Sequence, residues 1–109
     1  MVPDKILENN FHRAMISIYE KAKEACNYTP TRFLQMVQEY GGVKTAKRLL
    51  AKSEVQTGLV TLWECHRLDL SMEVLVLKPH FQLLFSKEEL DAARDRLTAY
   101  GYEFNNESD

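Results

Sequence analysis

The chain has 109 residues, of which 45% are hydrophobic and 28% charged, and its formal net charge at pH 7 is −2. This composition is typical of one soluble globular domain and excludes an intrinsically disordered chain. No apolar run approaches the roughly 20 residues of a membrane-spanning helix, and Met1–Glu8 lacks the basic and apolar pattern of a signal peptide, so a cytoplasmic protein is expected.

The first predicted element is a long amphipathic helix over Asp4–Cys26. Hydrophobic residues recur there at spacings of three and four, for example from Phe11 to Ala22, and so share one face. Asn27 is suited to end this helix, since asparagine adopts the left-handed conformation more readily than most residues.

A second helix is predicted to start at Thr29-Pro30 and to end at Tyr40. Threonine is a good N-cap, and proline suits the first helical position because its missing N–H would be unpaired there anyway. Gly41 and Gly42 follow, and we expect one to take a positive φ while the other allows a sharp change of direction.

Four further helices complete the prediction. They cover Val43–Lys52, Gly58 to about His66, a segment near Leu70–Leu77, and Lys87–Tyr100. Trp63 is expected to turn inward in the second of these. The third is expected to be buried and capped by Asp69 or Ser71, and the fourth follows a Ser86/Glu89 capping box. The chain is therefore predicted to be all-α: a compact single-domain bundle or orthogonal array of five to six helices over residues 1–104, with a frayed tail at 105–109.

The residues that could bind a metal or act as nucleophiles are scattered along the chain. They are His12, Cys26, Cys65, His66 and His80. They form no CxxC or HxxxH pattern, and the sequence has no GxSxG, glycine-rich phosphate loop or dinucleotide fingerprint. We therefore expect no metal, no cofactor and no enzymatic activity.

The two cysteines, Cys26 and Cys65, leave two alternatives open. They could form one disulfide, or they could remain a reduced and partly buried pair. The reduced pair is favoured here, because disulfides are rare in chains that stay in a reducing compartment.

A basic face is predicted on the helix over Val43–Lys52. At about 100° per residue, Lys44, Lys47, Arg48 and Lys52 fall opposite its apolar face. A helix-turn-helix interpretation is disfavoured, because basic residues occupy the position of a buried aliphatic and the helix lacks outward Asn, Gln or Ser to read bases. Two interpretations remain: a solvated lysine face, or weak, non-sequence-specific binding of nucleic acid through phosphates.

A compact polar segment, Glu64–Asp69, separates two apolar stretches. In the structural interpretation Arg67 bonds a carbonyl or carboxylate and Asp69 caps the next helix. In the functional interpretation Trp63, Arg67 and Asp69 form a corner that binds a partner, since Trp and Arg are favoured at interface hot spots.

Four blocks of the sequence resemble a family of small, uncharacterised, all-helical bacterial proteins. They are Thr31–Val43 (TRFLQMVQEYGGV), Ala46–Leu50 (AKRLL), Gly58–Glu73 with its LWE and RLDLS segments, and Leu84–Tyr102 with its closing YGY. This resemblance implies a module that occurs alone or attached to nuclease- or restriction-like proteins, and so an accessory module rather than a catalyst. It implies no catalytic residues.

The leading hypothesis is a non-enzymatic helical module that binds another protein, or a second copy of itself, through the corner from Trp63 to Asp69. The alternative is a weak nucleic-acid-binding accessory protein that uses Lys44, Lys47, Arg48 and Lys52. The first requires an exposed apolar patch near Trp63, and the second requires that acidic side chains do not pair with all four basic residues.

Overall fold

The computed structural model describes residues 2–52 and 57–104. The described part of the chain is all-α, as predicted, with six α-helices, two short 3₁₀ helices and no strand. The α-helices are α1 (Val2–Cys26), α2 (Thr31–Tyr40), α3 (Gly42–Ala51), α4 (Thr57–Glu64), α5 (Met72–Val76) and α6 (Lys87–Ala99); the 3₁₀ helices are η1 (Leu68–Leu70) and η2 (Gln82–Leu84). The predicted tail at 105–109 lies outside the described residues.

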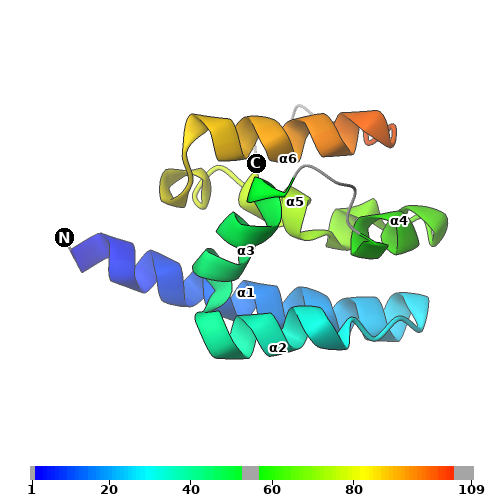
Figure 1. The fold of residues 1–109 in the computed structure, drawn as a ribbon, viewed down its shortest axis with the longest axis horizontal. Helices are drawn as coiled ribbons and strands as arrows, with labels where there is room; N and C mark the ends of the chain where they lie inside the picture. Colours follow the sequence, from blue (N-terminus) through cyan, green and yellow to red (C-terminus); the bar gives the residue numbers. More distant parts are fainter. Residues whose placement is uncertain (1, 53–56, 105–109) are drawn as a thin grey trace.

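The helices form layers (Figure 1). Helices α1 and α2 lie antiparallel along one side, and α6 lies along the opposite side. Helix α3 crosses between them at a steep angle, while α5 and α4 occupy the middle. No helix within the described residues is both long and apolar enough to cross a membrane.

The main hydrophobic core lies where α1, α3, α5 and α6 meet. Phe11 and Met15 of α1 are fully buried at its centre. Phe81 and Phe85 contact the Phe11 ring edge-on, with centroids 5.1 and 5.3 Å away. A smaller cluster of Ala22, Leu62 and Leu70 joins the far end of α1 to α4 and η1.

The two glycines between α2 and α3 have different roles. Gly41 takes the positive φ, +92°. Gly42 is buried against α1, where an added Cβ would come within 2.7 Å of the His12 Cα. The Gly42 N–H also donates to His12 Nδ1 at 3.0 Å, so α3 starts in direct contact with α1.

Several predicted helix ends are confirmed, one predicted cap is wrong, and one of two alternative caps is selected. Asn27 has a φ of 55°, and both bonds of the Ser86/Glu89 capping box are present. Thr29 does not cap α2, because the helix begins later, at Thr31, and its N-cap position is held by Pro30. Ser71 caps α5 by accepting from the Val74 N–H at 3.2 Å, so Asp69 is not the cap.

Arg96 of α6 holds the centre of the bundle together. Its guanidinium bonds the Glu73 carboxylate at 3.1 Å, the carbonyl of Leu49 in the last turn of α3, and the carbonyl of Lys52, the residue that follows α3. Burial raises the pKa of the Glu73 carboxyl, and the bond from Arg96 acts in the opposite direction. One side chain thus joins α3, α5 and α6.

Candidate functional site

The corner from Trp63 to Asp69 forms where α4 ends. His66 takes a left-handed conformation with a φ of 64°. The His66 N–H donates to the Trp63 carbonyl at 3.0 Å, and the Arg67 N–H donates to the Leu62 carbonyl at 2.9 Å. This pair of bonds is a Schellman motif, with His66 in the position that glycine usually holds.

Helix α6 ends in the same way. Gly101 has a φ of +78°, and the Tyr102 N–H donates back to the Leu97 carbonyl at 3.0 Å, which is again a Schellman motif. The two helix ends meet, because the rings of Trp63 and Tyr100 lie with their centroids 5.5 Å apart and their planes tilted by 55°.

A hollow of about 620 Å³ lies between these two helix ends. We call it the Trp63 hollow. Its lining comes from the end of α4, the turn after it, η1 and the end of α6: Trp63, Glu64, His66, Leu68, Asp69, Tyr100, Gly101, Tyr102 and Glu103.

Trp63 is exposed at this hollow. Its side chain does not turn inward as the helical pattern suggested, since the residue retains 45% of its accessible surface while Leu59 and Leu62 of the same helix are buried. Phe104 is similarly exposed at 44% and stands edge-on to Tyr102, with centroids 5.1 Å apart. Trp63 therefore exposes its ring in the lining of the hollow, and Phe104 exposes its ring next to the lining residue Tyr102.

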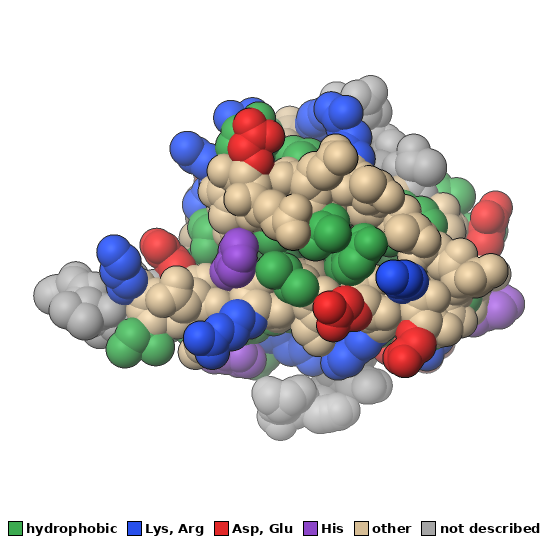
Figure 2. Space-filling model, turned by 90° about the horizontal axis from the view of Figure 1, so that it is seen from below, with side chains coloured by type: hydrophobic (Ala, Val, Ile, Leu, Met, Phe, Trp, Pro, Cys, Tyr) green, Lys and Arg blue, Asp and Glu red, His purple; other side chains and the backbone are tan. Residues whose placement is uncertain are grey.

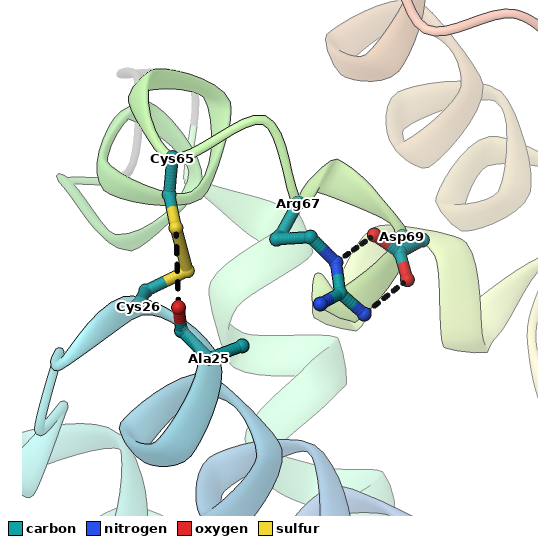
Figure 3. Close-up of a disulfide and its surroundings, with 5 residues drawn as sticks. All are labelled: Ala25, Cys26, Cys65, Arg67 and Asp69. Carbon is teal, nitrogen blue, oxygen red and sulfur yellow. Dashed lines mark hydrogen bonds and ion pairs between the residues drawn. A yellow bond between two sulfur atoms is a disulfide. The ribbon is translucent and has the colours of Figure 1, made fainter.

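Arg67 and Asp69 form a two-pronged ion pair (Figure 3). Arg67 Nε and Nη2 donate to the two carboxylate oxygens of Asp69 at 3.0 and 3.1 Å. These hydrogen bonds from Arg67 hold the pKa of Asp69 below its ordinary value. Arg67 thus bonds a neighbouring carboxylate, as the structural interpretation expected, although Asp69 caps no helix.

The other two carboxylates of the hollow are exposed. Neither Glu64 nor Glu103 forms an ion pair with a described residue. Partial burial, with a contribution from the Asp69 charge, raises the pKa of Tyr102. The C-terminal ends of α4 and α6 add negative partial charge at the same place. The Trp63 hollow is therefore aromatic and electronegative.

Cys26 and Cys65 form a disulfide, so the expectation of a reduced pair is wrong (Figure 3). The bond joins the last residue of α1 to the residue after α4, with the two Cα atoms 5.9 Å apart. Cys65 Sγ also lies 3.9 Å from the Ala25 carbonyl oxygen, a contact rather than a hydrogen bond because a disulfide sulfur has no proton to donate. The disulfide anchors the chain immediately before His66 and Arg67.

The four basic residues predicted on α3 differ in their surroundings. Lys47 pairs with Glu89 at 2.8 Å and lies 5.2 Å from the Phe85 ring centroid. The Arg48 guanidinium lies over the Tyr40 ring at 4.2 Å. Lys44 and Lys52 are exposed. Within the described residues, Lys47 is the one member of this face that pairs with a carboxylate.

Two of these residues line a second cavity, of about 490 Å³, between α2 and the α3–α5 side of the bundle. We call it the basic groove. Its cations are Arg32, Arg48 and Lys52, and its aromatic rings are Tyr28, Phe33 and Tyr40. Glu73 is the lining carboxylate among the described residues, and Arg96 pairs with it.

The side of the molecule formed by α1 and α2 has a different surface (Figure 2). Hydrophobic side chains gather near its centre, and side chains of both charges surround them. Because the charges are mixed, this face presents no one-signed field to steer a charged partner.

The candidate metal ligands do not converge. No group of three or more His, Cys, Asp or Glu side chains within the described residues is arranged to hold a metal ion. His12 bonds the Gly42 N–H, and both cysteines are in the disulfide.

Comparison with known families, curated proteins and solved structures finds no match. Neither a family model nor a curated sequence nor a known fold aligns significantly with this chain. The resemblance to small bacterial accessory modules therefore remains a prediction from the sequence blocks, and the function is inferred from the geometry of the two cavities.

Sequence reasoning named part of the Trp63 hollow and missed the rest. It singled out Trp63 and Asp69, which line the hollow, and Arg67, which does not but pairs with Asp69. It did not single out Tyr100, Tyr102 or Glu103, which the fold brings to the same place. The closing YGY pattern was a usable signal, because a Schellman close with tyrosines on both sides of its glycine places two rings at the helix end.

Proposed function

We propose that this protein is a non-enzymatic interaction module that binds a protein partner, or a second copy of itself, through the Trp63 hollow. The observation that carries the proposal is the exposure of Trp63, at 45%, beside a hollow bordered by further aromatic rings. Tryptophan and tyrosine are enriched at interface hot spots because they offer large, rigid contact area.

The rigidity of the corner from Trp63 to Asp69 also supports binding of a partner there. Two Schellman closes, the Arg67–Asp69 ion pair and the disulfide all fix the backbone around the hollow. A preorganised surface loses little conformational entropy when a partner binds.

The experiment compares two single variants with the parent chain. Trp63→Ala removes the exposed ring of the corner, and Leu83→Ala removes an apolar side chain that is 82% exposed on η2, away from α4. Each protein is examined by sedimentation velocity for self-association and by affinity capture from a native lysate. Circular dichroism establishes that both variants retain their helices.

We expect Trp63→Ala to lose the captured protein or the self-associated species, with a loss of about 2 kcal/mol or more that is typical of a hot-spot tryptophan. Leu83→Ala should retain it. Equal capture and equal sedimentation by all three proteins would contradict the proposal.

A second candidate function has a specific observation in its favour. The basic groove combines three cations with three aromatic rings, the pairing that proteins use for single-stranded nucleic acid, where phosphates meet cations and bases stack on rings. This differs from a duplex-binding face, and it uses Arg48 and Lys52 of the predicted basic residues but neither Lys44 nor Lys47.

Fluorescence anisotropy tests this candidate with a labelled 12-nucleotide oligo-dT and a duplex of equal length. Binding should favour the single strand, weaken steeply as salt rises, and fall in Arg48→Gln but not in Lys44→Gln. No binding to either nucleic acid at low salt would exclude this function.

We also propose, as the sequence suggests, that the protein works in the cytoplasm. A disulfide persists more readily in oxidising compartments than in the cytoplasm, so the Cys26–Cys65 bond argues against this location. Cell fractionation tests the proposal: the protein should be recovered with cytoplasmic markers, and recovery with an oxidising or secreted fraction would contradict it.

A further inference from the structure

We infer that the Trp63 hollow binds the alkylammonium group of a lysine side chain on the partner protein. This inference rests on the proposed interaction function and specifies the group that it recognises. It arises from three features that occur together in one concave site: aromatic faces, a negative field and a shape that suits a compact cation.

Aromatic rings attract cations through the negative potential over their faces, and this attraction strengthens when the cation is partly removed from water. Trp63 and Tyr100 offer adjacent rings inside the hollow. The cation–π contacts within the described residues are Lys47 on Phe85 and Arg48 on Tyr40. No cation from the described residues therefore lies over the rings of Trp63 and Tyr100.

The charges at the hollow favour the same ligand. Glu64, Asp69 and Glu103 line it, and Arg67 compensates Asp69 alone. Glu64 and Glu103 retain exposed charges without an ion pair to a described residue. Such a site attracts an ammonium group and repels a carboxylate or phosphate.

The ring geometry distinguishes ammonium from guanidinium. A guanidinium is planar and binds best when it stacks flat on a ring, whereas an ammonium is a compact point charge. The planes of Trp63 and Tyr100 are tilted by 55°, so a planar group cannot lie parallel to both. The angle between the rings suits the compact cation.

The rim of the hollow favours a lysine side chain over a free small amine. Trp63, which lines the hollow, and Phe104, which packs on the lining residue Tyr102, are each nearly half exposed. The methylene stem of a lysine can lie along such apolar surface while its charged end enters the site. A free amine with a short chain would leave this rim uncovered.

The test uses four peptides of one uncharged Gly/Ser sequence, capped at both ends, with a single central lysine, acetyllysine, trimethyllysine or arginine. Because Trp63 is the only tryptophan of the chain, its fluorescence reports on the hollow directly. Amide chemical-shift changes in ¹⁵N-labelled protein locate the binding site. Free n-butylammonium is titrated in parallel.

We expect the lysine and trimethyllysine peptides to bind about tenfold more tightly than the acetyllysine peptide, which has the same stem without the charge. Shift changes should centre on α4 and residues 100–104. Tyr100→Leu and Glu103→Gln should each weaken binding about 3- to 10-fold. Glu88→Gln, at the opposite end of α6, should leave it unchanged.

Equal binding of the acetyllysine peptide, or no binding of the lysine peptide, would overturn the inference. Tighter binding of the arginine peptide would show that the site recognises a guanidinium and not an ammonium group. Equally tight binding of n-butylammonium would show that its ligand is a small amine and not a protein side chain. If the peptides fail while Trp63→Ala still abolishes partner capture, the interaction function stands and only its lysine ligand is wrong.

Discussion

His66 is one of two non-glycine residues with a positive φ in the described part of the chain. Asn27, the other, tolerates this conformation because its short polar side chain can bond locally. Histidine also occurs at positive φ more often than most residues, and at His66 the two Schellman hydrogen bonds that end α4 hold this conformation. The backbone strain at His66 therefore lies at the edge of the Trp63 hollow.

Replacing His66 by glycine should stabilise the fold. The left-handed conformation costs an L-residue roughly 1–2 kcal/mol. The greater freedom of glycine in the unfolded chain offsets roughly 0.5–1 kcal/mol of that gain. Urea denaturation should therefore show a net gain of about 0.5–1 kcal/mol for His66→Gly. Gly101→Ala, at a φ of +78°, is the opposite control and should lose stability; an unchanged midpoint for both would contradict the argument.

Gly42 shows how much one residue can depend on the fold around it. The sequence predicts a sharp turn at the Gly41-Gly42 pair, and Gly41 has the positive φ. The requirement for glycine at position 42 comes instead from the His12 backbone, 2.7 Å from where a Cβ would stand. That contact joins residues 30 positions apart and cannot be read from local pattern.

At the scale of elements, the side chain of Arg96 in α6 connects this helix to α5 and to the end of α3. Its side chain is 14% exposed and that of Glu73 is 4% exposed. Its bonds to carbonyls at the end of α3 supply partners for groups that a helix C-terminus leaves unpaired. Arg96 thus also pairs with carbonyls at the C-terminal end of α3.

Arg96→Ala should destabilise the protein by about 3–5 kcal/mol, because it leaves Glu73 buried without its partner and the α3 carbonyls without a donor. Arg96→Lys should lose less, since an ammonium keeps the charge but cannot match the fork of the guanidinium. Chemical denaturation measures both. A loss of less than about 1 kcal/mol in Arg96→Ala would show that the pair does not support the bundle.

The carboxylate of Glu89 makes the stability of the fold depend on pH. Partial burial acts to raise the pKa of its carboxyl, but the hydrogen bonds from Lys47 and Ser86 prevail and lower it. A lowered pKa contributes stability above the unfolded value of 4.5, and this contribution is lost as the pH falls through the folded value.

Glu89→Gln should therefore reduce stability at neutral pH and flatten the loss of stability below about pH 4.5. Denaturation midpoints measured from pH 7 to pH 3 provide the comparison. Glu88→Gln, on the adjacent exposed position, is the matched control and should follow the parent curve. Parallel curves for Glu89→Gln and the parent would contradict the assigned role.

At the scale of the whole molecule, the disulfide closes a loop of 39 residues between α1 and the end of α4. A loop of this length restricts the unfolded chain, by about 4 kcal/mol in the chain-entropy model. The closed loop contains α2 and α3, which both contribute residues to the lining of the basic groove.

Reduction should lower the free energy of unfolding by about 2–4 kcal/mol without unfolding the protein at 25 °C. Urea denaturation with and without a phosphine reductant measures this difference. The double variant Cys26→Ser/Cys65→Ser should match the reduced protein and show no response to reductant. A response in the double variant, or none in the parent, would contradict the assignment.

The sequence by itself determined the helical class and most helix ends. The Ser86/Glu89 box, the Asn27 and Gly41 exits and the Gly101 close all act within a few residues, so each is visible as a local pattern. Local pattern also misplaced the beginning of α2. Thr29 has the right chemistry for an N-cap, but the helix begins only after Pro30.

The tertiary structure alone decided the pairing of the cysteines, the Arg96–Glu73 bond and the composition of the Trp63 hollow. Each joins segments between 23 and 40 residues apart, and periodicity cannot specify how helices pack around a shared core. Trp63 shows the difference: its place in the helical pattern suggested burial, whereas the packing of α4 against α1 left it facing the end of α6. Local hydrogen bonding sets where a helix ends, and burial of distant apolar surface sets what its end meets.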